Sequence, residues 1–270
     1  MNEQSMIDAV AGSTYVVHLA SPFFFGGSDE EVITPAVNGT LACMRACEAA
    51  GVRRCVLTSS LFSIMNMAEA DKPADRVFDE SHWSNVNREE PMEVYAKSKV
   101  LAEKAAWDFV AALPADKKFE LVAILPAFVM GPPLRKENFS SGGWLQSLMY
   151  GKMEKIESRR NCVVDVRNAA FGHLAGVKVA AAAGKRFILC QGSPSFIDYA
   201  APVIAKYAPL GWPITQAKEE VRPEEKFNLF NNTASKKVLG VDYIDFSKTM
   251  VDMADKMVEL GTLSKDAPAQ

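Results

Sequence analysis

The sequence has no long hydrophobic run and no excess of positive charge. It holds 30 lysine and arginine residues against 33 aspartate and glutamate residues, for a net charge of −3. This balance does not predict the basic surface that nucleic acids or anionic membranes require. A membrane-spanning helix needs about 20 mostly apolar residues, and the first residues lack the pattern of a secretion signal. We therefore expect a cytoplasmic protein without nucleic-acid or membrane partners.

Cysteine and histidine are also scarce. The five cysteines are Cys43, Cys47, Cys55, Cys162 and Cys190, and they form no Cys-x-x-Cys motif. The first two are one helical turn apart, but no histidine lies close in sequence to complete a zinc-binding set. We predict reduced, packed thiols and no metal site.

The residues that are present predict an α/β fold. The 270 residues, 49% of them hydrophobic, are enough for one large globular domain with its own core, or for one domain and a small lobe. Buried strand patterns alternate with helical patterns, which favours a parallel sheet with helices on both faces. Strands are expected at 14–20, 54–59, 119–125, 161–166 and 186–190, and helices at 30–50, 93–112, 168–183 and 246–260.

Tyr95 and Lys99 are the most informative pair. Their spacing of four residues places a phenol and an ammonium group on one face of the helix that spans 93–112. A neighbouring cation favours the phenolate, so we expect the pKa of Tyr95 to fall. Such a tyrosine is a candidate general acid or base. The pattern alone is weak, because ordinary helix surfaces produce it often.

Further segments, in the same order along the chain, resemble the extended short-chain dehydrogenases/reductases of the dihydroflavonol 4-reductase-like branch, which includes cinnamoyl-CoA reductases and carbonyl reductases. The resemblance covers nearly the whole chain. It rests on 16–22 (VVHLASP), 35–40 (PAVNGT), 56–60 (VLTSS), 79–83 (DESHW), 124–132 (ILPAFVMGP) and 164–173 (VDVRNAAFGH).

This resemblance implies a doubly wound, Rossmann-like parallel sheet in residues 1–192 and a substrate lobe mainly in 193–270. It implies reversible reduction of a ketone or aldehyde with NADP(H), NAD being possible, in which Ser60, Tyr95 and Lys99 are catalytic. Tyr95 and Lys99 would also contact the cofactor, together with Ala20, Ser21, Thr58, Pro126 and Val129.

The family's Gly-x-x-Gly-x-x-Gly turn, which holds the cofactor pyrophosphate at a helix N-terminus, is missing from the sequence. The segment 5–12 already resembles the helix before the family's fourth strand. We therefore expect residues 1–270 alone to be an N-terminally incomplete fold that binds NADP(H) poorly or not at all. The sheet edge at 14–20 would be uncovered, which could lead to self-association.

Several residues have an ordinary structural interpretation beside a functional one. Asn38 could hold a water in a proton relay or lie on a helix surface. His18 and His173 are expected to be structural, and Arg167 to pair with Asp165. Apolar side chains that could line a substrate pocket, but are more often core, are Phe23, Phe24, Phe25, Met65, Met130, Trp144 and Met149.

Two alternative functions remain open. A truncated relative without the phosphate-binding turn could be a non-catalytic binding or regulatory protein. A sugar-nucleotide epimerase or dehydratase shares the serine and the Tyr-x-x-x-Lys pattern, but usually has Arg-x-x-Asn-x-Tyr-Gly-Pro where this sequence has 125–132 (LPAFVMGP). The substrate itself cannot be predicted from these residues.

Overall fold

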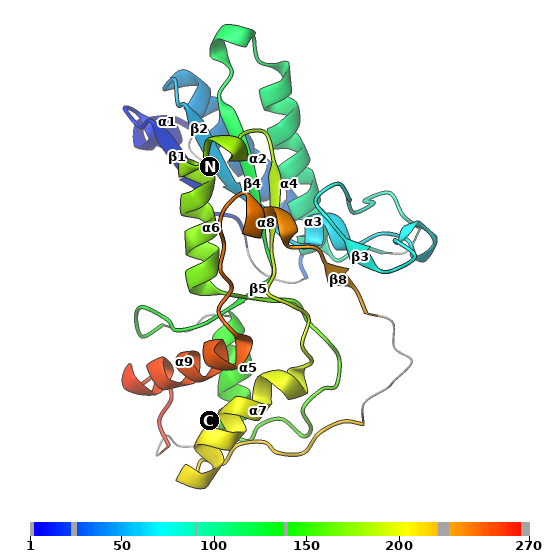
Figure 1. Cartoon of the computed structure of the whole chain (residues 1–270). Helices are drawn as coiled ribbons and strands as arrows, with labels where there is room; N and C mark the ends of the chain where they lie inside the picture. The colour runs from blue at the N-terminus through cyan, green and yellow to red at the C-terminus, as the bar shows by residue number, and fades with distance from the viewer. Residues whose placement is uncertain (1–2, 23–25, 90, 138–139, 221–226, 266–270) are drawn as a thin grey trace. The chain divides into compact units, whose positions relative to one another are not determined.

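A computed structural model of the chain describes residues 3–22, 26–89, 91–137, 140–220 and 227–265. The described elements group into two compact units, each drawn from several stretches of sequence (Figure 1). The boundary predicted at residue 192 is a single cut in the sequence, whereas each of these units combines several stretches, so the boundary stays a prediction. Unit 1 consists of Met1–Pro126, Phe171–Leu189 and Phe230–Val241, and unit 2 of Ala127–Ala170, Cys190–Leu229 and Asp242–Gln270.

Unit 1 is built on a parallel sheet with the strand order β1-β2-β4-β7. All of its described pairings are parallel, and their register aligns His18 with Leu57, and Thr58 with Ile124. The carboxyl ends of these strands therefore meet at one edge, where parallel sheets commonly bind ligands. The strands are β1 (Tyr15–His18), β2 (Arg54–Thr58), β4 (Glu120–Pro126) and β7 (Arg186–Leu189).

Helices cover both faces of this sheet. On one face Cys55 and Leu121 pack into a core with residues of α1, α2 and α4. On the other face a side chain at Gly176 of α6 would meet Val56 and Val122, because alternate residues of a strand point to opposite faces. The helices are α1 (Glu3–Val10), α2 (Asp29–Ala49), α3 (Phe62–Met65), α4 (Val94–Ala112), α6 (Val166–Lys178, shared with unit 2) and α8 (Thr233–Lys237).

Local sequence explains where the two long helices begin. Ser28 and Glu31 form a capping box at the start of α2, in which each side chain accepts the other residue's backbone N–H. The Glu93 side chain accepts the N–H of Ala96 at the start of α4. Both helices lie within one residue of the predicted 30–50 and 93–112, and Gly51, at φ +64°, follows the end of α2.

Unit 2 has its own core around Tyr199 and Met253. The predicted strand at 161–166 is present as β6, but it pairs with β5 in a separate two-stranded sheet. Sequence analysis had no expectation for α5 and α7. The elements of unit 2 are β5 (Phe128–Met130), α5 (Ser140–Met149), β6 (Val163–Asp165), α7 (Phe196–Tyr207) and α9 (Phe246–Glu259). Separately, the short strands β3 (Val77–Phe78) and β8 (Leu229–Phe230) form a two-stranded sheet.

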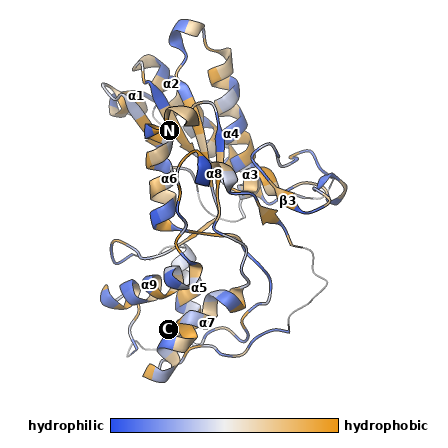
Figure 2. Ribbon diagram, viewed as in Figure 1, coloured by the Kyte–Doolittle hydropathy of each residue, from blue (hydrophilic) through white to orange (hydrophobic). Residues whose placement is uncertain are grey.

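The helices are amphipathic. Figure 2 shows α4 and α6 with hydrophilic and hydrophobic residues alternating along their ribbons, whereas the neighbouring strands are mostly hydrophobic. No helix in the described part of the chain is both long enough and apolar enough to span a membrane.

Candidate functional site

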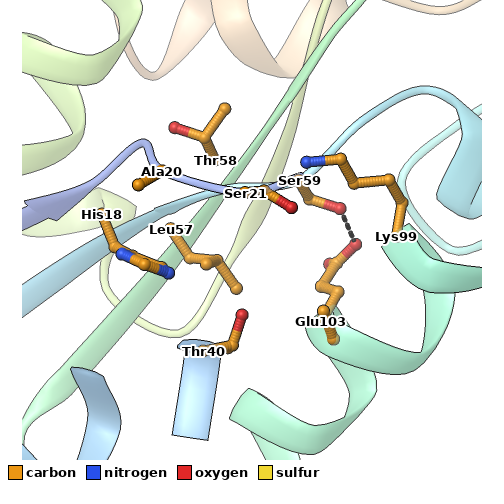
Figure 3. Close-up of a pocket in the computed structure, with 10 residues that line it drawn as sticks. His18, Ala20, Ser21, Thr40, Leu57, Thr58, Ser59, Lys99 and Glu103 are labelled. Atoms are coloured by element: carbon orange, nitrogen blue, oxygen red, sulfur yellow. Dashed lines mark hydrogen bonds between the residues drawn. The ribbon is translucent and has the colours of Figure 1, made fainter. Parts of the chain in front are cut away.

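A pocket opens at the carboxyl ends of β1 and β2 in unit 1 (Figure 3). Its walls come from these strands, from the residues that follow them, and from α2 and α4. Several polar groups therefore converge here, and convergent polar groups are what orient a ligand in its site. The lining residues are His18, Ala20, Ser21, Thr40, Leu57, Thr58, Ser59, Lys99, Ala102 and Glu103.

One face of α4 carries Tyr95, Lys99 and Glu103, each four residues after the last. All three are buried. The Lys99 ammonium lies 5.4 Å from the centre of the Tyr95 ring, and the ring packs edge-on against Phe62 at 5.8 Å. The predicted neighbourhood of phenol and ammonium is therefore confirmed.

The prediction that Lys99 lowers the pKa of Tyr95 is wrong for this structure. Burial raises the pKa of Tyr95, and the nearby Glu93 carboxylate raises it further. The phenol is removed from water, whereas the ammonium lies over the ring face. Tyr95 is therefore protonated at neutral pH, which is the form that can donate a proton.

Burial lowers the pKa of Lys99 to about 8. An unfolded lysine titrates near 10.4, so between these values the unfolded chain binds more protons than the folded chain. The charged ammonium thus costs stability at neutral pH, and stability recovers as pH rises through this window.

We expect Lys99→Met to stabilise the fold at pH 7 by about 1–3 kcal/mol, since about 1.4 kcal/mol corresponds to each pKa unit. The gain should shrink as pH approaches 10, where the unmodified lysine is neutral in the fold. Urea unfolding at pH 7 and pH 10 measures both values. Lys97→Met is the matched control, because Lys97 lies on the same helix and forms a partly exposed ion pair with Asp29. A Lys99→Met protein that is less stable than this control at pH 7 would contradict the expectation.

The two adjacent serines differ in their hydrogen bonds. Ser59 donates to the buried Glu103 carboxylate at 2.5 Å. The Ser60 hydroxyl oxygen accepts the Phe62 N–H at 3.2 Å, an arrangement that leaves the hydroxyl proton directed elsewhere. Figure 3 shows Ser59 between Lys99 and Glu103. Ser59 lines the pocket, whereas Ser60 follows it on the chain.

The other predicted cofactor contacts divide between the units. Ala20, Ser21 and Thr58 line the pocket. The Pro126 carbonyl accepts the Leu61 N–H at 3.2 Å, which holds the end of β4 beside the loop after β2. Val129 lies in β5 of unit 2. Their contacts with a cofactor stay predictions.

The remaining candidates are placed as follows. Asn38 is exposed on α2, Phe23–Phe25 lie outside the described residues, and Thr58 Oγ1 is 2.8 Å from the His173 imidazole. The predicted pair of Arg167 and Asp165 is confirmed at 2.7 Å. The core interpretation is confirmed for the fully buried Met130 and Met149 and for Trp144, which packs against the unit 2 core.

Sequence analysis missed Thr40 and Glu103 as pocket residues. Glu103 continues the four-residue spacing of Tyr95 and Lys99, which could have revealed it. It accepts hydrogen bonds from Ser59, Trp107 and Arg186. Thr40 lies on the buried face of α2 and has no comparable signal.

The polar side chains of the pocket are of the kind that bind the ribose of a nicotinamide dinucleotide. Lys99, Ser21 and Thr58 offer the ammonium and hydroxyl groups that a ribose can bind. The pyrophosphate half has no comparable donor set at the start of α2, where the capping box already occupies backbone N–H groups and Asp29, Glu30 and Glu31 add negative charge.

The model of the 3-beta hydroxysteroid dehydrogenase/isomerase family matches residues 1–208 of the chain. The chain belongs to this family. Its similarity to methylglyoxal and cinnamoyl-CoA reductases also confirms the predicted dihydroflavonol-reductase-like branch and the α/β fold with a doubly wound parallel sheet.

Two relatives and one solved structure show what the chain is similar to. The NADPH-dependent methylglyoxal reductase of Saccharomyces cerevisiae is 32% identical over 266 residues, covering 90% of this chain and 76% of the relative. Cinnamoyl-CoA reductase 1 of Arabidopsis thaliana is 29% identical over 258 residues, covering 95% and 72%. The crystal structure of the yeast methylglyoxal/isovaleraldehyde reductase with NADPH superposes with a TM-score of 0.82 at 26% identity, covering 96% of this chain and 81% of that one.

Proposed function

We propose that this family member is an NADP(H)-dependent reductase of ketones or aldehydes. The observation that carries the proposal is the row of Tyr95 and Lys99 on α4, with Lys99 in the pocket at the carboxyl ends of the parallel strands. The names of the relatives, a methylglyoxal reductase and a cinnamoyl-CoA reductase, support a carbonyl substrate and NADPH.

In this proposal Tyr95 donates its phenolic proton to the carbonyl oxygen, and Ser60 orients that oxygen through its hydroxyl group. Lys99 binds the ribose beside Ser21 and Thr58. NADPH, when bound, supplies the reducing hydride. The raised pKa of Tyr95 keeps the proton available in the reducing direction.

The direct test is the oxidation of saturating NADPH by the 270-residue chain with methylglyoxal, isovaleraldehyde and other aldehydes and ketones. We expect consumption that depends on the carbonyl compound. Titration with NADPH, followed by tryptophan fluorescence, shows separately whether the cofactor binds. Saturated cofactor binding without turnover of any carbonyl compound would contradict the proposal.

The second candidate function is a non-catalytic binding or regulatory role. The capped, acidic start of α2 favours it, because this helix offers no pyrophosphate site. If the protein has this role, addition of NADPH should not change its tryptophan fluorescence at any concentration.

The two serines give a sharper prediction. We expect Ser60→Ala to lower kcat about 10²-fold, the usual cost of removing one donor to a reacting oxygen. Ser59→Ala should retain activity within a few-fold, because Glu103 keeps its bonds from Arg186 and Trp107. Steady-state kinetics of the two variants decides the assignment, and the reverse order of effects would transfer the role to Ser59.

We also propose that two copies of this chain associate through β1. Among the described residues, β1 pairs with β2 alone, and Tyr15, Val17 and Leu19 are 42%, 41% and 62% exposed. An uncovered apolar edge strand is a template for pairing. We expect Val17→Lys to shift the 270-residue chain toward monomer in sedimentation velocity runs. An unchanged distribution of species would exclude this edge as the contact.

A cytoplasmic location is part of the proposal. Its support is that all five cysteines, each within the described residues, are buried and outside any disulfide, as is usual where thiols stay reduced. Imaging of the chain fused to a fluorescent protein tests the location.

A further inference from the structure

Three cysteines that lie apart in the sequence meet in the core of unit 1. Cys43 and Cys47 are one turn apart on the buried face of α2, and Cys55 is on β2. Their Sγ atoms all lie within 4.8 Å of one another. Each side chain is at most 1% exposed. Two elements therefore direct their thiols to one point.

A histidine adjoins the same point. His18 ends β1, next to Leu57 of β2 in the parallel register. Of the three thiols, Cys43 is the one with which the His18 side chain interacts. The imidazole is 8% exposed and also lines the pocket, so that it connects the thiols with a route from solvent.

From this arrangement we infer that Cys43, Cys47, Cys55 and His18 form a binding site for one thiophilic metal ion such as Zn²⁺. Three sulfur ligands and one imidazole are a common donor set for tetrahedral zinc. Sulfur atoms bound to one zinc ion at about 2.3 Å lie about 3.8 Å apart. The thiols thus need to move by only about 1 Å from their greatest possible separation of 4.8 Å, whereas His18 lies outside this cluster and its imidazole must approach the thiols when the ion binds.

The remaining surroundings suit a soft metal ion. The thiols share their core cluster with Val10, Met44, Val52 and Leu57, so the neighbouring groups are apolar. Thiolate ligands select zinc or copper(I) over magnesium and calcium, which prefer oxygen. Binding would release thiol protons to solvent and join α2, β2 and β1, the last of which is the edge strand.

Co²⁺ serves as the spectroscopic probe. Reduced, metal-free 270-residue chain is titrated with Co²⁺ under anaerobic conditions. We expect the visible bands of tetrahedral cobalt and a sulfur-to-cobalt charge-transfer band, both saturating at one equivalent and disappearing when Zn²⁺ is added. Zn²⁺ in excess, with its free concentration 100-fold above its Kd, should also raise the Tm by about 5–10 °C. No charge-transfer band in the unmodified chain would overturn the inference.

Two variants with equal numbers of thiols locate the ion. Cys43→Ala/Cys55→Ala removes two of the proposed ligands and should lose the charge-transfer band. Cys162→Ala/Cys190→Ala removes two buried thiols of unit 2 and should keep it. The band surviving in the first variant, or disappearing only in the second, would overturn the assignment.

X-ray absorption of the unmodified chain with one equivalent of Zn²⁺ does not depend on whether a variant folds. We expect three sulfur neighbours at about 2.3 Å and one nitrogen at about 2.0 Å. A first shell of nitrogen and oxygen alone would place the ion elsewhere and overturn the inference. A second result would also overturn the inference. In it, protein isolated without reductant contains a disulfide within the cluster, and the reduced protein binds no metal.

Discussion

Tyr95→Phe should remove most carbonyl reduction while leaving NADPH binding nearly unchanged. Phenylalanine keeps the ring, its edge-on contact with Phe62 and the neighbouring Lys99 ammonium, and loses only the hydroxyl group. General acid catalysis typically contributes about 10²–10⁴-fold, so kcat should fall by a factor in this range. Because burial raises the pKa of Tyr95, the unmodified chain should keep its reductive rate well into alkaline pH.

NADPH oxidation at saturating substrate measures this loss, and a fluorescence titration measures cofactor binding in the same preparation. Tyr150→Phe is the matched control, since Tyr150 lies after α5 in unit 2. Turnover by Tyr95→Phe within a few-fold of the unmodified chain would remove Tyr95 from the mechanism.

Arg186→Met should destabilise the fold by about 3–5 kcal/mol, the usual cost of breaking a buried ion pair from one side. The Arg186 and Glu103 side chains are 9% and 0% exposed, and their charged atoms are 2.7 Å apart. Arg186 also donates to the carbonyl oxygens of Glu80 and His82 and stacks on Trp83 at 3.7 Å. Its loss leaves a buried carboxylate and two carbonyl groups without these donors.

Urea unfolding at pH 7 measures the loss, with Arg45→Met as the matched control. Arg45 pairs with Glu3 at the surface, with side chains 41% and 48% exposed, so its removal should cost at most about 1 kcal/mol. Equal losses in the two variants would mean that the Glu103 pair contributes no more than a surface pair.

Local signals explain which parts of the fold could be predicted. The helix at 30–50 has a capping serine at one end and Gly51 at the other, and the strand at 119–125 is an apolar run interrupted only by Glu120. Both signals act within a few residues, so the sequence contains them in full. The region after residue 193 has α7 with Pro202 inside it, a residue that obscures a helical pattern.

The candidate site was predictable where its residues share one element. Tyr95 and Lys99 are neighbours on α4, so their spacing was sufficient. The pKa of Tyr95 was not predictable, because it depends on burial and on Glu93 more than on Lys99. Likewise the approach of Cys55 and His18 to Cys43 depends on how β1 and β2 align with α2, and sequence distance concealed it.

The order of the strands also determines when the sheet can be completed during synthesis. β4 pairs on one side with β7, yet residues 127–170, which belong to unit 2, are translated between them. A ribosome-bound chain therefore presents β4 as an apolar sheet edge until residue 189 has left the exit tunnel. Pairings between distant segments form slowly, and exposed edges aggregate in the meantime. The nascent chain is therefore the form in which this strand is most exposed to aggregation.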